Sequence, residues 1–183
     1  MGDELRGENL VHLNVRFSTE TELKKIQDFL YEKSGQGVSF TGLVEAMVNE
    51  VTIVTAVHNI KSNKGSKTAG VDKIKMDKYL QMPKDELILL IQSCFRNYRP
   101  KPARREYIEK SNGKKRPLGI PTVLDRIIQE CVRIIIEPIC EARFYPQSYG
   151  FRPYRAQKHA IRGIINVINA GCKSPDQPVW AIE

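Results

Sequence analysis

The stretch RREYIEKSNGKKRPLGIP, residues 104–121, predicts a β-hairpin. Tyr107 and Ile108 favour a strand, and the Asn112-Gly113 pair that follows tolerates the positive φ angles of a two-residue hairpin turn. Four cations crowd the tip of this hairpin: Lys110, Lys114, Lys115 and Arg116. Because like charges repel one another, the cluster indicates either an anionic partner or a solvated, charged loop.

The positive charge of the chain is concentrated in the same region. The 183 residues carry a net charge of +8, and 41% hydrophobic with 27% charged residues is typical of a globular protein. Residues 96–116 hold nine Lys or Arg and two Asp or Glu, whereas residues 1–60 are net acidic. A concentrated excess favours nucleic acid as the partner, ahead of an anionic membrane.

The cysteines and the hydropathy pattern indicate a protein of a reducing compartment. The four cysteines form no C-x-x-C pair and no zinc-ligand spacing, so we expect buried thiols: Cys94, Cys131, Cys140 and Cys172. The N-terminus lacks the apolar segment of a signal peptide, and no apolar run is long enough to span a bilayer. We therefore expect a cytoplasmic protein that does not bind membranes.

Apolar periodicity and capping residues predict five helices. The first runs from a capping box at Thr19 to Gly35, and the second from Gly42 to Ile60. The third begins with Pro83 at the first helical position and ends before Tyr98. The fourth runs from the cap Thr122 to Pro138, and the fifth from Ala156 to Ala170. Residues 61–72 read as a basic loop.

The fourth helix carries the strongest apolar stripe, from Leu124 to Ile139, which predicts the core of the protein. Pro138 is expected to kink or end this helix near Glu137. Residues 179–183 (VWAIE) read as the start of a buried strand, so we expect the chain to be a fragment cut within that strand.

Three groups of motifs, in order along the chain, resemble the group II intron-encoded reverse transcriptases. The hairpin stretch and DRIIQ (125–129) are similar to the first conserved block of this family. The segments EPI (137–139) and SYGFRP (148–153), with Arg155 and Ala160, are similar to the second block. Upstream, KG (64–65) and AGVD (69–72) resemble the N-terminal extension, so the resemblance covers roughly residues 42–183.

The resemblance implies a helix-rich α/β fold, in which the reverse-transcriptase fingers carry an antiparallel fingertip hairpin packed on helices and the palm is truncated. The expected divisions are an N-terminal arm and helix (1–41), an extension helix with the basic loop (42–72), the fingers (73–178) and the start of a palm strand (179–183).

The resemblance also implies an RNA-directed DNA polymerase and intron maturase, of bacterial origin, that serves splicing and retrohoming. Its partners would be group II intron RNA, an RNA template, a DNA primer and deoxynucleotide triphosphates. The first catalytic aspartate of the family lies just beyond Glu183, so the two Mg²⁺ ions of the intact enzyme have no carboxylate site in this chain. We expect the fragment to hold no cofactor, to contain no catalytic residue and to be inactive alone.

Within the resemblance, Lys110 and Arg116 correspond to the fingertip cations that contact the nucleotide triphosphate. A two-residue turn would pair Glu109 with Arg116 and would put Lys110 on the opposite face, whereas a five-residue loop would pair Lys110 with Arg116. The nucleotide role therefore requires the longer loop or a bulge. Glu109 departs from the family, which usually has proline there.

The remaining cations are candidates for template or intron RNA. They are Lys61, Lys64, Lys67, Lys101, Arg104, Arg105, Lys114, Lys115, Arg126 and Arg152. Backbone phosphates are the expected target, since such contacts hold register without reading bases. The alternatives are a solvated loop for residues 61–67 and an ion pair with Glu130 for Arg126. Phe151 is expected to pack within its turn.

Other functions remain open at this stage. The chain could be a stand-alone RNA-binding module, or it could belong to a retron or CRISPR-linked reverse transcriptase. An apolar surface left by the absent palm, or present in the native protein, could also make a homodimer. The sequence beyond Glu183 and the oligomeric state of the protein separate these alternatives.

Overall fold

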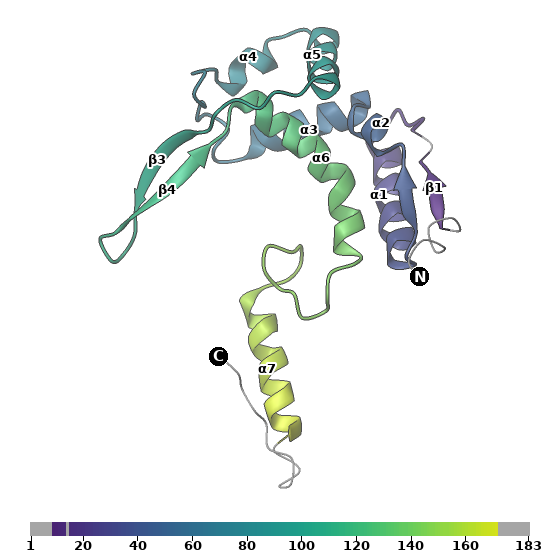
Figure 1. Cartoon of the computed structure of the whole chain (residues 1–183), viewed down its shortest axis with the longest axis vertical. Coiled ribbons are helices and arrows are strands. Elements are labelled where there is room, and N and C mark those ends of the chain that lie inside the picture. Colours follow the sequence, from purple (N-terminus) through teal and green to yellow (C-terminus); the bar gives the residue numbers. More distant parts are fainter. Residues whose placement is uncertain (1–8, 14, 172–183) are drawn as a thin grey trace, which may run out of the picture. The chain divides into compact units, whose positions relative to one another are not determined.

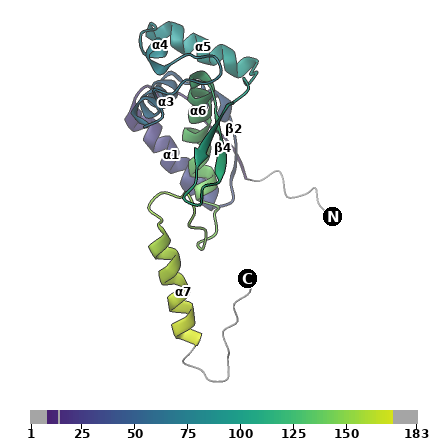
Figure 2. The same cartoon turned by 90° about the vertical axis from the view of Figure 1, so that its left-hand side faces the viewer.

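The computed structural model describes residues 9–13 and 15–171, and the chain divides into the units Met1–Ala142 and Arg143–Glu183. Helices dominate both units (Figures 1 and 2). The elements are β1 (Leu10–His12), α1 (Glu20–Gly35), β2 (Ser39–Thr41), α2 (Leu43–Met47), α3 (Glu50–Ser62), α4 (Met76–Leu80), α5 (Lys84–Arg96), β3 (Arg104–Glu109), β4 (Lys115–Ile120), α6 (Val123–Glu141) and α7 (Gln157–Gly171). The helix-rich α/β prediction is confirmed.

Helix α1 begins where the sequence predicts. Thr19 accepts a hydrogen bond from the backbone N–H of Glu22, and the Glu22 carboxylate accepts from the backbone N–H of Thr19, which completes the capping box. The strands on either side of α1 were not predicted: β1 and β2 pair in parallel, with Leu10 opposite Ser39. Three-residue strands carry too little alternation to stand out in a sequence.

The predicted helix from Gly42 to Ile60 is wrong in one respect, because the structure breaks it into α2 and α3. The break is at Asn49, whose side chain accepts from the N–H of Val51 at 2.9 Å and so caps α3. The Asn49 amide also donates to the carbonyls of Val15 and Phe17. Contacts with a distant segment thus decide where the chain turns.

Helix α6 is the centre of the first unit and packs against α1, α2 and α3. Its predicted apolar stripe is confirmed as core: Ile127, Cys131 and Ile135 have no exposed surface. Burial raises the pKa of the Cys131 thiol to about 12. The expectation of buried thiols is wrong for Cys140, which is exposed, and Cys94 is only half-buried. Cys172 lies outside the described residues.

Pro138 does not end α6, which continues to Glu141. Proline has no N–H, so the carbonyl four residues earlier, on Ile134, loses its helical donor. The side-chain amide of Gln27 on α1 replaces that donor at 2.9 Å. Of the two outcomes expected at Pro138, an end of the helix is wrong, and a kink stays a prediction. The side chain of a neighbouring helix supplies the hydrogen bond that proline cannot make.

The predicted N-terminus of α5 is shifted by one residue. Pro83 is the capping residue rather than the first helical residue, and α5 begins at Lys84. In the second unit, the helix predicted from Ala156 is confirmed as α7. The strand predicted from Val179 lies outside the described residues.

Candidate nucleic-acid interface

The predicted hairpin exists as β3 and β4, and its turn is the bulged alternative rather than the two-residue turn or the five-residue loop. The N–H of Lys110 donates to the carbonyl of Lys114 at 2.8 Å, and the N–H of Gly113 donates to the carbonyl of Lys110 at 3.0 Å. Gly113 has a φ of 73°, so a type I turn is followed by a left-handed residue. The loop therefore contains three residues, Ser111 to Gly113, rather than two or five.

This register places Lys110 and Arg116 on the same face of the hairpin. Arg116 lies directly opposite Ile108, and cross-strand partners share a face. Ile108 and Lys110 also share a face, because side chains alternate along a strand. The two cations are thus diagonal neighbours, which typically have Cα atoms about 7–8 Å apart.

The same register removes Glu109 as a competitor for Arg116. Glu109 lies opposite Lys115, on the other face of the hairpin. The pairing of Glu109 with Arg116 that a two-residue turn would produce is therefore wrong. A one-residue change in register moves every side chain of a strand to the other face, so the length of the turn decides whether Glu109 lies opposite Arg116.

The cations of the tip have no acidic partner within the described part of the chain. Their side chains are exposed, and no described carboxylate forms an ion pair with Lys110, Lys114, Lys115 or Arg116. In Figure 1 the hairpin projects from the helices of its unit, with the turn between β3 and β4 at its far end. The tip therefore presents uncompensated positive charge to solvent.

The cations at the base of the hairpin differ from those at the tip, because two of the three form ion pairs with carboxylates. The Arg104 guanidinium lies 3.0 Å from the Glu106 carboxylate, and the Lys101 ammonium lies 3.8 Å from that of Asp72. Arg105 lies on the opposite face from Arg104, beside Tyr107. Among these three predicted RNA contacts, only Arg105 has no acidic partner in the described residues.

The basic loop, residues 61–72, is attached to the base of the hairpin at Gly70. A Cβ atom at Gly70 would lie 2.6 Å from the Cα of Thr122 and 2.9 Å from the carbonyl oxygen of Pro121. Only glycine permits this approach, because the neighbouring atoms are backbone. The AGVD motif therefore contacts the N-terminus of α6, far from it in sequence.

Arg126 holds the same loop by its backbone. Its guanidinium donates to the carbonyl of Gly65 at 2.9 Å and to the carbonyl of Thr68. The alternative partner, Glu130, is wrong, since Glu130 bonds Arg133 and Asn59 instead. Burial lowers the pKa of Arg126, opposed by the charge of Asp72. Arg126 therefore positions the loop, and direct RNA contact by Arg126 stays a prediction.

The predicted start of the basic loop at residue 61 is wrong by two residues, because Lys61 lies in the last turn of α3. Lys61, and Lys64 and Lys67 in the loop, are exposed and make no ion pair with a described carboxylate. Because Arg126 lies on α6 and bonds the loop, it holds the exposed cations of the loop close to the start of α6, which directly follows the hairpin and its cations. The structure brings the loop and the hairpin base together, which no spacing in the sequence indicated.

The second unit contains Arg152 in the aromatic turn. Its guanidinium donates to the carbonyls of Tyr145 and Ser148, each at 2.9 Å, and lies 5.2 Å from the ring centre of Phe144. These contacts hold the turn together, and template contact by Arg152 stays a prediction. The expected packing of Phe151 is wrong, because its side chain is fully exposed.

Tyr154 adopts a backbone conformation that is unusual for its residue type. Its φ of 58° lies in the left-handed region that glycine favours. Its side chain is fully exposed, so no packing contact requires tyrosine there. The backbone of this turn therefore keeps the conformation that glycine would adopt.

A half-buried polar cluster at the base of the hairpin was only partly predicted. The expected cap is present, with the hydroxyl of Thr122 accepting from the N–H of Asp125 and donating to its carboxylate at 2.6 Å. Sequence reasoning missed Tyr98, whose hydroxyl donates to the same carboxylate at 3.0 Å. Burial, and then this hydrogen bond, raises the pKa of Tyr98. The cluster joins the end of α5 to the start of α6.

Neither a metal site nor a membrane span is found in the part of the chain that the structure describes. Within residues 9–13 and 15–171, no three His, Cys, Asp or Glu side chains are grouped so that they could hold a metal ion. In the same residues, no helix combines the length and apolarity needed to cross a bilayer.

Comparison with known proteins identifies the relatives of the chain. It is 42% identical over 127 residues, 68% of its length, to the group II intron-encoded protein LtrA of Lactococcus lactis. It is 34% identical over 93% of its length to an uncharacterised 91 kDa protein in the cob intron of Schizosaccharomyces pombe. It is 31% identical over 63% of its length to nuclear intron maturase 1 of Arabidopsis thaliana. No family profile matches the chain.

The chain is therefore a homologue of intron-encoded proteins and intron maturases. More narrowly, it is a homologue of the group II intron-encoded proteins, as the motifs of the sequence indicate. It spans 21% of LtrA, 21% of the Schizosaccharomyces protein and 14% of the Arabidopsis maturase, which is about a fifth of these relatives or less.

Proposed function

We propose that the chain is the fingers region of an RNA-directed DNA polymerase and intron maturase. In this role it binds template RNA and group II intron RNA, and its fingertip contacts the incoming deoxynucleotide triphosphate. The homology to group II intron-encoded proteins supports the general activity. The observation that carries the nucleotide role is the hairpin register, which puts Lys110 and Arg116 on one face.

The chemistry of these two side chains suits a triphosphate. Arg116 offers a planar fork that can donate two hydrogen bonds to phosphate oxygens, and Lys110 supplies a compact charge. Neither has an acidic partner among the described residues, so neither must break an ion pair to bind the anion. Glu109 points to the opposite face and does not repel the phosphates from this side.

The RNA surface of the proposal combines the basic loop with the hairpin. Its exposed cations, which form no ion pair with a carboxylate of the described residues, are Lys61, Lys64, Lys67, Arg105, Lys114 and Lys115. Contacts between such cations and phosphates release counterions, so binding should weaken steeply as salt rises. Splicing and retrohoming follow from this proposal as functions of the intact protein.

Chemistry in the intact protein would use two Mg²⁺ ions, which stabilise the attacking and leaving oxygens of phosphoryl transfer. Carboxylates of the intact protein would hold these ions, and no group of three His, Cys, Asp or Glu suited to a metal ion is found in the described residues. The part of the protein described here binds and orients the nucleotide and the template. We expect the chain alone to add no nucleotide to a primer.

The nucleotide role can be tested in the intact protein with Lys110→Ala and Arg116→Ala, and with Lys115→Ala as a control from the opposite face. We expect each of the first two to raise the KM for deoxynucleotides about tenfold, since a charge-assisted hydrogen bond contributes about 1.5–3 kcal/mol. RNA affinity should stay nearly unchanged. Lys115→Ala should weaken RNA binding and leave this KM unaltered.

Two results would contradict the proposal. If Lys110→Ala and Arg116→Ala weaken RNA binding as much as nucleotide incorporation, these residues contact RNA and not the nucleotide. If the 183-residue chain extends a primer with template, nucleotides and Mg²⁺, the proposal that it is only the fingers region is wrong.

A further inference from the structure

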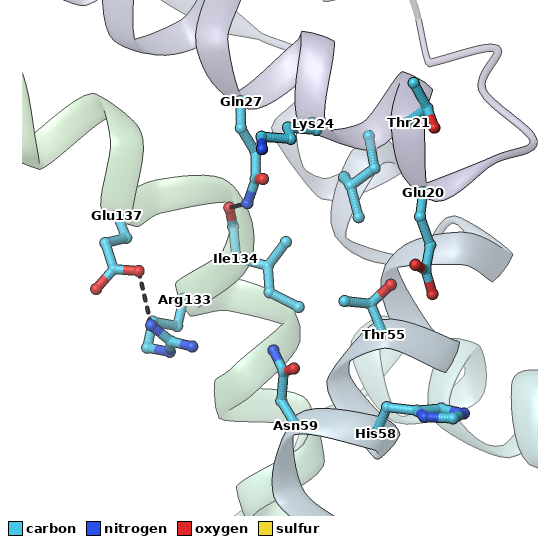
Figure 3. Close-up of a pocket in the computed structure, with 11 residues that line it drawn as sticks. Glu20, Thr21, Lys24, Gln27, Thr55, His58, Asn59, Arg133, Ile134 and Glu137 are labelled. Atoms are coloured by element: carbon cyan, nitrogen blue, oxygen red, sulfur yellow. Dashed lines mark hydrogen bonds and ion pairs between the residues drawn. The ribbon is translucent and has the colours of Figure 1, made fainter. Parts of the chain in front are cut away.

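A polar pocket of about 620 Å³ lies between α1, α3 and α6, apart from the hairpin (Figure 3). Ligand pockets in proteins have volumes of about 300–1,000 Å³, so this pocket can hold a small molecule or one nucleotide. The lining includes Leu23 and Ile134 as apolar residues and several polar side chains: Glu20, Thr21, Lys24, Gln27, Thr55, His58, Asn59, Arg133 and Glu137.

One buried hydroxyl in this lining lacks a partner. The Oγ1 atom of Thr55 is inaccessible to solvent and has no hydrogen bond with any described residue. Buried polar atoms are nearly always hydrogen-bonded, and an unpaired hydroxyl costs about 1–3 kcal/mol. In Figure 3 this oxygen is directed towards the space below α1. A rotation of the Thr55 side chain about χ1 would bring this hydroxyl to the pocket, where a bound molecule with polar atoms would satisfy it.

The pocket is also rich in hydrogen-bond acceptors. The amide nitrogens of Gln27 and Asn59 donate to the carbonyl of Ile134 and the carboxylate of Glu130, at 2.9 Å and 2.7 Å. These bonds fix both amides, and their oxygens accept no hydrogen bond from the described residues. The carboxylate of Glu20 adds a further acceptor, which repels phosphate and attracts N–H groups.

Two flat side chains complete the lining. The Arg133 guanidinium donates to Glu130 at 2.6 and 2.8 Å and to Glu137 at 2.6 Å. These hydrogen bonds use the N–H groups along the edge of the guanidinium plane, and a base would stack on the face of that plane. Burial opposes ionisation of Glu130, but hydrogen bonds from Arg133 and Asn59 lower its pKa overall. His58 is exposed and unpaired within the described residues. RNA-binding proteins stack bases on guanidinium planes and histidine rings.

We infer that this pocket receives one unpaired RNA base that carries an exocyclic amino group. The amino group would donate to the oxygens of Gln27, Asn59 or Glu20, and the Thr55 hydroxyl would bond a ring nitrogen. Uracil has no amino group and presents two carbonyl oxygens, so the acceptors of the pocket disfavour it. The inference rests on the proposed RNA-binding function.

The surroundings of the pocket favour an RNA source for this base over a free nucleotide. Lys24 stands on the rim of the pocket, without an ion pair to a described carboxylate, where it can neutralise a flanking phosphate. His58 and Asn59 lie within one helical turn of Ser62, where α3 ends in the basic loop. An RNA strand that crosses the basic loop can therefore place a base in the pocket.

The test uses the full chain and three RNA hairpins that differ at one position of the stem: a bulged adenine, a bulged uridine, and no bulge. Fluorescence anisotropy at fixed salt gives the three affinities. We expect the adenine bulge to bind about tenfold more tightly than the paired stem, as one good base contact gives about 1–3 kcal/mol. The uridine bulge should bind like the paired stem.

Two variants test the residues, and one provides a matched control. Thr55→Val removes the unpaired hydroxyl without removing a hydrogen bond of the fold, so it should not lower Tm. Thr55→Val and Lys24→Ala should each abolish most of the preference for the adenine bulge. Lys25→Ala removes the same charge from an exposed neighbour outside the pocket and should keep the preference.

The outcomes separate this inference from the proposed function. If no RNA binds, the proposed function fails. If all three RNAs bind equally, the chain binds RNA but the pocket does not receive an RNA base, and a protein partner would then be the expected occupant of the pocket. If adenosine monophosphate binds and Thr55→Val abolishes its binding while no bulge is preferred, the ligand is a free nucleotide and the RNA inference is overturned.

Discussion

The side chain of Gln27 replaces the hydrogen bond that Pro138 removes from helix α6. Its amide nitrogen lies 2.9 Å from the carbonyl oxygen of Ile134, which has no helical donor because residue 138 is a proline (Figure 3). Ser34, also on α1, donates to the carbonyl of Ile139 at 2.8 Å. Helix α1 therefore stabilises the second half of α6 through backbone groups as well as through apolar contacts.

We predict that Gln27→Ala lowers the free energy of unfolding by about 1–3 kcal/mol, because the Ile134 carbonyl is left without a donor. The cost should be smaller when Pro138 is also replaced by alanine, because the new N–H can reach Ile134. Urea denaturation of the two single variants and the double variant measures this coupling. Additive effects would show that the two residues act independently.

Gly70 should tolerate no side chain. Gly70→Ala would place a Cβ atom 2.6 Å from the Cα of Thr122, and the backbone would have to move. We expect a loss of about 1–3 kcal/mol in unfolding free energy, as in other overpacked sites. Gly65→Ala is the matched control, because a Cβ there meets nothing within 4 Å. Equal effects of the two substitutions would contradict the close approach at Gly70.

Arg126 should hold the basic loop in one conformation. In Arg126→Met the carbonyls of Gly65 and Thr68 lose their donors, so we expect trypsin to cleave after Lys64 and Lys67 several times faster than in the parent chain. Arg96→Met, on the exposed end of α5, is the control. An unchanged cleavage rate in Arg126→Met would show that the loop is held by other contacts.

Glu130 should make stability depend on acid pH. Its pKa lies below the ordinary value of 4.5, since the bonds from Arg133 and Asn59 outweigh the effect of burial. A carboxyl with a lowered folded-state pKa stabilises the protein above its unfolded pKa, and this stabilisation is lost as pH falls through the folded value. The unfolding free energy should therefore decline as pH falls below about 4.5.

The control for that prediction is Glu130→Gln, which keeps the shape and loses the charge. Its unfolding free energy at pH 7 should be lower than that of the parent, and its decline below pH 4.5 should be shallower. Parallel pH profiles for the two proteins would show that other carboxyls cause the acid dependence.

The local signals of the sequence were sufficient for the main elements. The capping box at Thr19, the stripe on α6 and the hairpin at residues 104–120 depend on spacings of a few residues, which a sequence displays directly. The ordered motifs also identified the family that the homologues confirm. The short strands β1 and β2 were missed, because a parallel pair depends on two segments far apart in the chain.

The candidate site depended on tertiary structure. The sequence by itself determined a basic hairpin with Asn112 and Gly113 in its turn, but not the number of loop residues, which the left-handed conformation of Gly113 decides. That one conformation sets the register and so brings Lys110 and Arg116 to the same face. The attachment of the basic loop by Arg126 joins residues about 60 positions apart, and only the folded chain places them in contact.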